Sequence, residues 1–187
     1  FNDIFDGSKE MHQSFIEHYH KVRLNPIRVS ADEFSYPIHV YIRYEIEKEI
    51  FNNKIQFKDI HHLWNKYYKQ FLDIDIPNDT VGVLQDIHWY EGIFGYFPTY
   101  AIGAMISSQI KFSCPEYQSF IDNVSVESIR SVTDWLKNNI HQKASLYSSD
   151  EMLQVISGEP LNSSYFLRFN TNANVFFTER EFGTLNE

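Results

Sequence analysis

A stretch from Gly82 to Trp89 combines an amide, a carboxylate, an imidazole and an indole among apolar neighbours. The polar members are Gln85, Asp86, His88 and Trp89. Buried polar groups need hydrogen-bond partners, so one interpretation is a buried loop in which Gln85 and Asp86 bond to backbone amides. The other is the wall of a cleft, from which His88 donates a hydrogen bond to a substrate carbonyl or a developing oxyanion.

Two tyrosines, Tyr96 and Tyr100, follow on either side of a rigid proline, Pro98. Glycines lie close by, and a residue without a side chain lets a ligand or another backbone approach closely. One interpretation is a tight loop that enters a packed helix. In the other, one phenol, Tyr96 or Tyr100, donates a hydrogen bond to a tetrahedral intermediate.

Further upstream, Arg28 precedes Asp32 by four residues at the entry to a predicted helix. An exposed ion pair between these two side chains is the simpler interpretation. If Arg28 instead faces a cleft, it suits the terminal carboxylate of a peptide, because the guanidinium fork matches a carboxylate in bidentate geometry.

Catalytic motifs that act on their own are absent from the sequence. None of the eight histidines is followed by Glu, so there is no HExxH, and there is no P-loop, GxGxxG or GxSxG motif. His18 with His20 and His61 with His62 lack the i, i+4 helical spacing that points two imidazoles at one metal ion. We therefore expect surface or packing roles for these histidines and no metal site built from the chain's own motifs.

Hydrophobic periodicity predicts that helices position these residues, so the fold class is mainly α. Apolar residues recur at helical spacing, and caps or breakers bound several of the segments. The expected helices are Tyr36–Phe51, Ile60–Phe71, a stripe from Val126 to Ile140, a short helix after a Ser148–Glu151 capping box that Gly158 stops, Phe15–Val22 and Thr99–Ile110. Strand alternation is weak, and the best candidates are Ile27–Val29 and Val175–Phe177.

Composition limits the class of protein and its partners. The 187 residues are 43% hydrophobic and can bury a core, and we expect a helical region over residues 1–170 and an irregular tail over 171–187. The 16 Lys and Arg residues against 25 Asp and Glu give a net charge of −9, which disfavours nucleic acid as a partner. Polar residues, glycines and a proline interrupt the uncharged stretch Gly92–Ile110, so no membrane span is expected. A single cysteine fits a reducing, intracellular compartment.

Three motifs in this order resemble the Taq-type carboxypeptidases, a family of metal-dependent HExxH exopeptidases. They are IRxxAD at Ile27–Asp32, GxxQDxHW at Gly82–Trp89 and GYFPTY at Gly95–Tyr100. The similarity continues to about Phe169. In the family, the HExxH helix and a later Glu that completes the metal site precede IRxxAD, and this chain has no such residues. The chain therefore resembles the C-terminal portion only.

The resemblance implies a multi-helix part of a groove-shaped zinc-peptidase fold and a cytoplasmic enzyme that releases C-terminal residues from peptides. Zinc or another divalent metal would act in the parent enzyme. The implied partners are the peptide substrate, the missing N-terminal half and a second copy in a homodimer. This chain would supply half of the substrate cleft and be inactive alone. The alternative is a non-catalytic peptide-binding or interaction module descended from such an enzyme.

The resemblance also assigns roles to single residues. It implies that Arg28 recognises the substrate carboxylate and that His88, with Tyr96 or Tyr100, stabilises the oxyanion. Asp86 and Gln85 would orient the wall of the cleft. The full substrate-binding set expected from the motifs is Arg28, Asp32, Gln85, Asp86 and Trp89.

Overall fold

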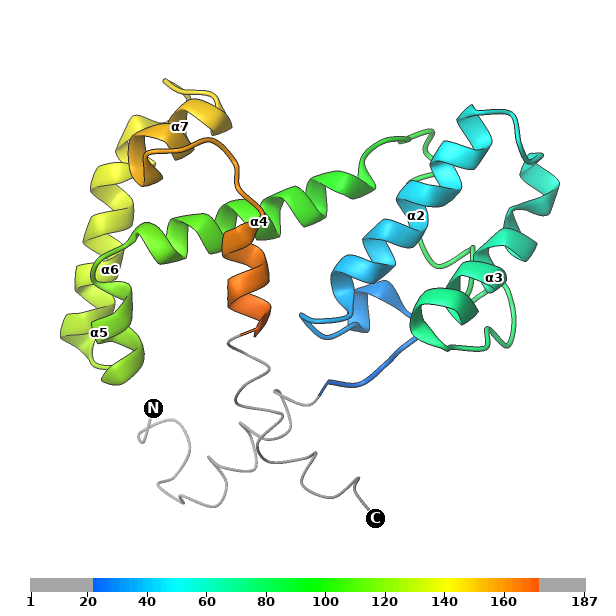
Figure 1. Cartoon of the computed structure of the whole chain (residues 1–187), viewed down its shortest axis with the longest axis horizontal. Helices are drawn as coiled ribbons and strands as arrows, with labels where there is room; N and C mark the ends of the chain where they lie inside the picture. Colours follow the sequence, from blue (N-terminus) through cyan, green and yellow to red (C-terminus); the bar gives the residue numbers. More distant parts are fainter. Residues whose placement is uncertain (1–21, 172–187) are drawn as a thin grey trace, which may run out of the picture. The chain divides into compact units, whose positions relative to one another are not determined.

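The computed structural model describes residues 22–171, and all regular structure in this range is helical (Figure 1). The mainly α class is therefore confirmed. The chain divides into two compact units, one within residues 1–99 and one within residues 100–187. Three expected features cannot be compared with the structure. The strand Val175–Phe177 lies outside the described residues, and so do the helix Phe15–Val22 except for its last residue and the irregular tail 171–187 except for its first.

In the first unit, helix α2 spans Tyr36–Phe51, as the sequence predicts. The isoleucines that recur every fourth residue, Ile42, Ile46 and Ile50, are all buried. Pro37 lies in the first turn, where its missing N–H costs no intrahelical bond. Ser35 precedes the helix, but its side chain caps no backbone N–H of α2, because its hydroxyl donates to Asp32 Oδ2 at 2.9 Å.

Helix α3 spans Ile60–Leu72 and packs against α2. Its apolar stripe was predicted, and it buries Trp64, Tyr68 and Leu72 against the isoleucines of α2. The rings of Trp64 and Tyr68 stack with centroids 5.0 Å apart. Each fully buried large side chain contributes about 1.5–3 kcal/mol, so this pair of helices is the stable frame of the first unit.

The strand expected over Ile27–Val29 is wrong. Residues Arg28–Ser30 form a short 3-10 turn, η1, in which the Ser30 N–H donates to the Ile27 carbonyl at 3.1 Å. Local hydrogen bonds thus satisfy this backbone, and no neighbouring strand is needed. The turn also leaves Arg28 buried, while Val29 stays 75% exposed.

A long connection, residues 73–96, joins α3 to the next helix without regular secondary structure. It contains the Gly82–Trp89 motif. At Gly82 a side chain would collide with its surroundings, because a Cβ there would lie 2.9 Å from Ile76 Cγ2 and 3.0 Å from the Asn78 carbonyl. The glycine that opens the motif is therefore required by the close approach of residues 76–79.

Helix α4 spans Phe97–Ser113, and the second unit continues with a series of shorter helices. These are α5 (Tyr117–Asp122), α6 (Val126–Asn139), α7 (Ser149–Ser157) and a helical segment over residues 164–171. Helix α4 begins two residues before the predicted start, because Pro98 fits into its first turn. Helix α5 was not predicted, since six residues are too few to show a periodicity.

The ends of α7 confirm the sequence signals. The Ser148 hydroxyl accepts from the Glu151 N–H, and Glu151 Oε2 accepts from the Ser148 N–H, which completes the capping box. Gly158 ends the helix with φ of 82°. The buried Gln109 of α4 then fixes the chain that follows, because its amide donates to Ser157 Oγ at 2.8 Å and to the Pro160 carbonyl at 3.0 Å.

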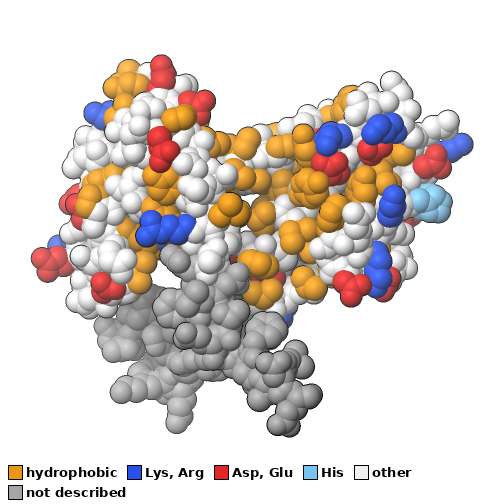
Figure 2. Space-filling model, in the orientation of Figure 1, with side chains coloured by type: hydrophobic (Ala, Val, Ile, Leu, Met, Phe, Trp, Pro, Cys, Tyr) orange, Lys and Arg blue, Asp and Glu red, His pale blue; other side chains and the backbone are white. Residues whose placement is uncertain are grey.

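The surface of the first unit mixes apolar side chains with paired charges (Figure 2). On α2, Tyr41, Tyr44 and Phe51 remain exposed, next to ion pairs such as Lys48 with Glu45. Within residues 22–171, no helix is both long and apolar enough to cross a bilayer.

Candidate functional site

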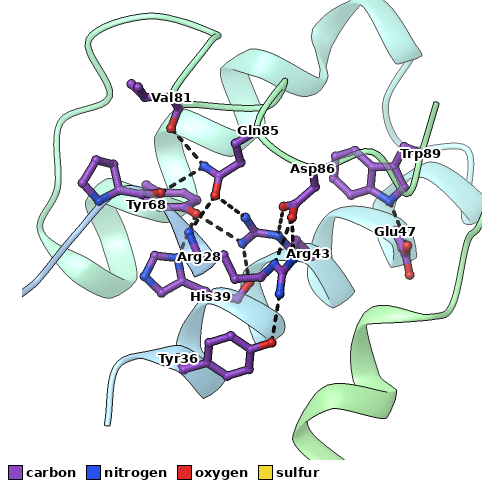
Figure 3. Close-up of polar contacts among 11 residues, drawn as sticks. Arg28, Tyr36, His39, Arg43, Glu47, Tyr68, Val81, Gln85, Asp86 and Trp89 are labelled. Carbon is purple, nitrogen blue, oxygen red and sulfur yellow. Dashed lines mark hydrogen bonds and ion pairs between the residues drawn. The ribbon is translucent and has the colours of Figure 1, made fainter. Parts of the chain in front are cut away.

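The centre of the candidate site is the carboxylate of Asp86, on which two guanidinium groups converge (Figure 3). Arg28 donates from Nη2 at 2.8 Å and from Nε at 2.9 Å, both to Asp86 Oδ1. Arg43 of α2 donates from Nε to Asp86 Oδ2 at 2.6 Å. The three side chains are nearly buried, so these charge-assisted bonds are made away from bulk water.

The two guanidinium groups also determine the charge state of Asp86. Burial acts to raise the pKa of its carboxyl, but the charges and hydrogen bonds of Arg43 and Arg28 outweigh burial and hold the pKa below its usual value. Asp86 is therefore an anion at neutral pH. Its partner Arg28 is turned toward the loop and not toward Asp32, so the exposed ion pair offered as the simpler interpretation is wrong.

Gln85 closes the same cluster through both ends of its amide. Its oxygen accepts from the Arg28 backbone N–H at 2.8 Å and from Arg43 Nη2 at 2.9 Å. Its nitrogen donates to the carbonyls of Pro26 and Val81 at 3.0 and 2.9 Å. Gln85 therefore bonds to the backbone, as the buried-loop interpretation predicts, while Asp86 bonds to guanidinium groups instead.

Arg43 is held on its far side by α2 and α3. Its Nη1 donates to the His39 carbonyl at 2.7 Å and to the Tyr68 hydroxyl at 3.2 Å. The Tyr68 hydroxyl lies 2.9 Å from His39 Nδ1. Burial, and next the positive charge of Arg43, lower the pKa of His39 to about 4, so this ring is neutral at neutral pH.

Aromatic faces support the two cations. The guanidinium carbon of Arg43 lies 4.5 Å from the centre of the Trp64 ring and 5.4 Å from that of Phe97. That of Arg28 lies 5.7 Å from Phe97, and its Nη1 donates to the Tyr36 hydroxyl at 2.9 Å. Ring faces stabilise a cation without supplying a counter-charge, which favours a positively charged cluster.

A second carboxylate, Glu47 of α2, fixes the end of the motif and the loop after it. Glu47 Oε1 accepts from the Trp89 indole N–H at 2.8 Å, and Oε2 accepts from the Gly95 backbone N–H at 3.0 Å. Glu47 is only 4% exposed. One buried side chain of α2 therefore connects two of the three sequence motifs.

His88 and Tyr96 lie together beside this loop. Their ring centroids are 5.7 Å apart, and the His88 ring is 4.4 Å from that of Phe97. His88 is buried and Tyr96 is 46% exposed. Burial is the main cause that lowers the pKa of His88, so its imidazole is neutral at neutral pH and able to donate one N–H.

The remaining predicted residues lie elsewhere. Asp32 organises the entry to α2, where its carboxylate accepts from the N–H groups of Phe34 and Ser35 at 3.0 and 2.8 Å. Tyr100 lies in the first part of α4, is half-buried and belongs to the second unit. The structure therefore brings Arg28, Gln85 and Asp86 into one cluster, and His88 and Tyr96 into contact.

The sequence reasoning missed several residues of the cluster, namely His39, Arg43, Glu47 and Tyr68. A signal was present: His39, Arg43 and Glu47 recur every fourth residue and form a polar stripe beside the buried isoleucines of the predicted helix. A polar stripe on a buried helix predicts a polar partner, and the loop with Asp86 and Trp89 is that partner.

No metal centre is formed by the residues described. Among residues 22–171, no three His, Cys, Asp or Glu side chains gather as a metal ion requires. The acidic groups of the site are already engaged, Asp86 by guanidinium groups and Glu47 by N–H donors. The described residues do not fit a catalytic metal.

Comparison with known proteins identifies the family of this helical chain. Residues 1–173 match the family described as Carboxypeptidase Taq (M32) metallopeptidase. The chain therefore belongs to this family.

Two curated relatives illustrate the similarity. Carboxypeptidase 1 of Bacillus subtilis is 38% identical over 150 residues, which are 78% of this chain and 29% of that protein. Thermostable carboxypeptidase 1 of Pyrococcus furiosus is 33% identical over 156 residues, which are 81% of this chain and 31% of that protein. The chain thus spans about a third of the length of the curated relatives it matches.

The fold comparison gives the same result. The solved structure of Trypanosoma cruzi metallocarboxypeptidase 1 superimposes with a TM-score of 0.80 at 32% identity, over 89% of this chain and 34% of that one. The resemblance to Taq-type carboxypeptidases is therefore confirmed at the level of the family, and the expected multi-helix fold is confirmed by its similarity to solved structures of that family.

Proposed function

We propose that the protein containing this chain is a metal-dependent carboxypeptidase, which releases C-terminal residues from peptides, and that this chain supplies part of its substrate cleft. The observation that carries the proposal is the family match over residues 1–173, with relatives named as carboxypeptidases. Because the chain spans about a third of those relatives, we propose that it is inactive without the rest of the fold.

In this proposal Arg28 binds the terminal carboxylate of the substrate. Support comes from its setting: the guanidinium is held by Asp86 at 2.8 Å, and the Phe97 ring lies behind it. The planar fork favours a carboxylate over an amide. Gln85 and Asp86 fix Arg28 in place through its backbone N–H and its side chain, and the Trp89–Glu47 bond fixes the end of the motif.

His88 and a tyrosine would stabilise the developing oxyanion. The neutral imidazole of His88 provides a hydrogen-bond donor that needs no change of protonation. Tyr96, in ring contact with His88 and 46% exposed, is the phenol that the contacts within the first unit favour. Tyr100 remains the second candidate. Asp32 would act on Arg28 only indirectly, through the turn that begins α2.

The family is one of metallopeptidases, and we propose zinc or another divalent ion as the cofactor of the whole enzyme. Residues outside those described would bind it. When bound, such an ion activates a water molecule and polarises the scissile carbonyl. The described residues would bind and orient the peptide.

The wider context is proposed on the same basis. The partners would be a peptide substrate, the part of the fold that this chain does not span, and a second copy in a homodimer. The single cysteine supports a reducing, cytoplasmic compartment.

The test uses the protein in its full natural length, purified with its metal. Incubated with a peptide that has a free C-terminus, it should release single residues from that end, and the amide of the same peptide should resist. Metal-loaded protein that binds the peptide without cleaving it would instead support the non-catalytic module.

A further inference from the structure

We propose that Arg43 is a positioning residue whose charge leaves the cluster of Arg28, Asp86 and Arg43 with one net positive charge, so that Arg28 can attract a substrate carboxylate. The inference rests on the proposed function and deepens it. It begins from one geometric fact: the two oxygens of Asp86 are divided between two cations, Oδ1 with Arg28 and Oδ2 with Arg43.

A single ion pair would be a poor carboxylate receptor. Arg28 and Asp86 alone carry no net charge, and an approaching carboxylate would meet the repulsion of Asp86 together with the attraction of Arg28. Arg43 satisfies the second oxygen of Asp86 at 2.6 Å. The cluster of two guanidinium groups and one carboxylate therefore keeps one positive charge.

Arg43 itself is not placed to bind the substrate. Its side chain has no exposed surface, whereas that of Arg28 is 8% exposed. Four of its five N–H donors have partners within the site, at Asp86 Oδ2, the His39 carbonyl, the Tyr68 hydroxyl and Gln85 Oε1. Arg43 can therefore act on the substrate only through Asp86 and Arg28.

The neighbouring ionisable groups do not cancel this charge directly. Glu47 directs its two oxygens at the N–H groups of Trp89 and Gly95. His39 is neutral at neutral pH, since its pKa is lowered to about 4 by burial and next by the charge of Arg43. The Trp64 face stacked on Arg43 stabilises a cation and adds no negative charge.

The experiment measures binding in the full-length protein, with two uncleavable peptides that differ only in a C-terminal carboxylate or amide. Calorimetry gives the dissociation constant of each, and the ratio of the two constants is the carboxylate preference. Arg43→Gln should reduce this preference by about tenfold, because it removes the charge that leaves the cluster positive. Arg130→Gln, which removes an exposed guanidinium on α6, should leave it unchanged.

The decisive variant is the double substitution Arg43→Gln with Asp86→Asn. It restores one net positive charge while the Asn oxygen can still accept from Arg28, so the carboxylate preference should recover. A double variant that prefers the carboxylate no better than Arg43→Gln alone would overturn the inference, because a packing role predicts further loss.

Two other variants separate the possible failures. If Arg28→Gln leaves the carboxylate preference intact, the proposed role of Arg28 fails. If Arg28→Gln abolishes it and Arg43→Gln does not change it, only the role of Arg43 fails. If Arg43→Gln does not fold, the single variant Asp86→Asn tests the role of the cluster's charge. We expect it to bind the peptide with a C-terminal carboxylate at least as tightly as the natural protein does, and tenfold weaker binding would contradict the inference.

Discussion

The indole N–H of Trp89 donates to Glu47 Oε1 at 2.8 Å, which joins the last residue of the Gly82–Trp89 motif to the C-terminal half of α2. The second oxygen of Glu47 accepts from the Gly95 N–H at 3.0 Å. Glu47, which belongs to none of the three sequence motifs, thus fixes the end of the Gly82–Trp89 motif and the start of the Gly95–Tyr100 motif.

Replacing Glu47 should therefore loosen the loop that carries His88 and Tyr96. Glu47→Ala leaves two N–H donors without this acceptor, and we expect a loss of about 2–3 kcal/mol in the free energy of unfolding. Hydrogen exchange at the Gly95 amide should accelerate. Glu47→Gln, which keeps one acceptor oxygen, should lose less, and Glu91→Ala at an exposed position serves as the control. An unchanged Gly95 exchange rate in Glu47→Ala would contradict the assignment.

Asp86→Ala should be among the most destabilising single changes in the first unit. It removes the carboxylate that two nearly buried guanidinium groups share, and breaking a buried ion pair costs about 3–5 kcal/mol. Urea unfolding measures the effect. The matched control is Asp134→Ala on the exposed face of α6, expected within about 0.5 kcal/mol of the natural protein. Equal effects for the two variants would show that the pairing does not stabilise the fold.

His39 should make stability depend on pH. Its pKa is about 4 in the folded state against 6.5 unfolded, so between these values the unfolded chain binds more protons. Its contribution is complete above pH 6.5 and is lost as the pH falls toward 4, in total about 3 kcal/mol. As the pH falls from 6.5 to 4, the free energy of unfolding, measured with urea at several pH values, should therefore decrease more steeply in the natural protein than in His39→Gln. Parallel curves for the two proteins would refute this.

Gly82 and Gly103 offer the same substitution with opposite expected signs. In Gly82→Ala the new Cβ would lie 2.9 Å from Ile76 Cγ2 and 3.0 Å from the Asn78 carbonyl, and the overpacking should cost about 1–3 kcal/mol. In Gly103→Ala, inside α4, the new Cβ would meet no atom of residues 22–171 within 4 Å apart from its chain neighbours and the backbone of its own helix, so the better helix propensity should add about 0.5–1 kcal/mol. Thermal unfolding of both variants checks this; destabilisation by Gly103→Ala or none by Gly82→Ala would be the contrary result.

The helices that were predicted well are those with a long apolar stripe. Helix α2 has the predicted bounds and α3 differs by one residue, because burial of the isoleucines and of Trp64 decides both local structure and packing. The segment Ile27–Val29, which contains Arg28, was one of two strand candidates with weak alternation. It is a 3-10 turn, since its hydrogen bonds are local and to Gln85.

Arg28, Gln85 and Asp86 of the candidate site could be predicted from the sequence, but the pairing of its charged side chains could not. Arg28 has a carboxylate four residues away at Asp32, yet it pairs with Asp86, 58 residues away. Periodicity reports which face of a helix is buried and carries no information on contacts between distant loops. Arg43 was missed for the same reason: its role appears only when α2 packs behind the loop that contains Asp86.

The most direct test of the account is the fate of a peptide pair with the full-length, metal-loaded protein. Mass spectrometry should show stepwise loss of C-terminal residues from the peptide with a free carboxylate, no loss from its amide, and no loss from either after chelation. Arg28→Gln should remove most of the difference between the two peptides. Intact peptides with the metal-loaded protein, or equal cleavage of acid and amide, would contradict the account.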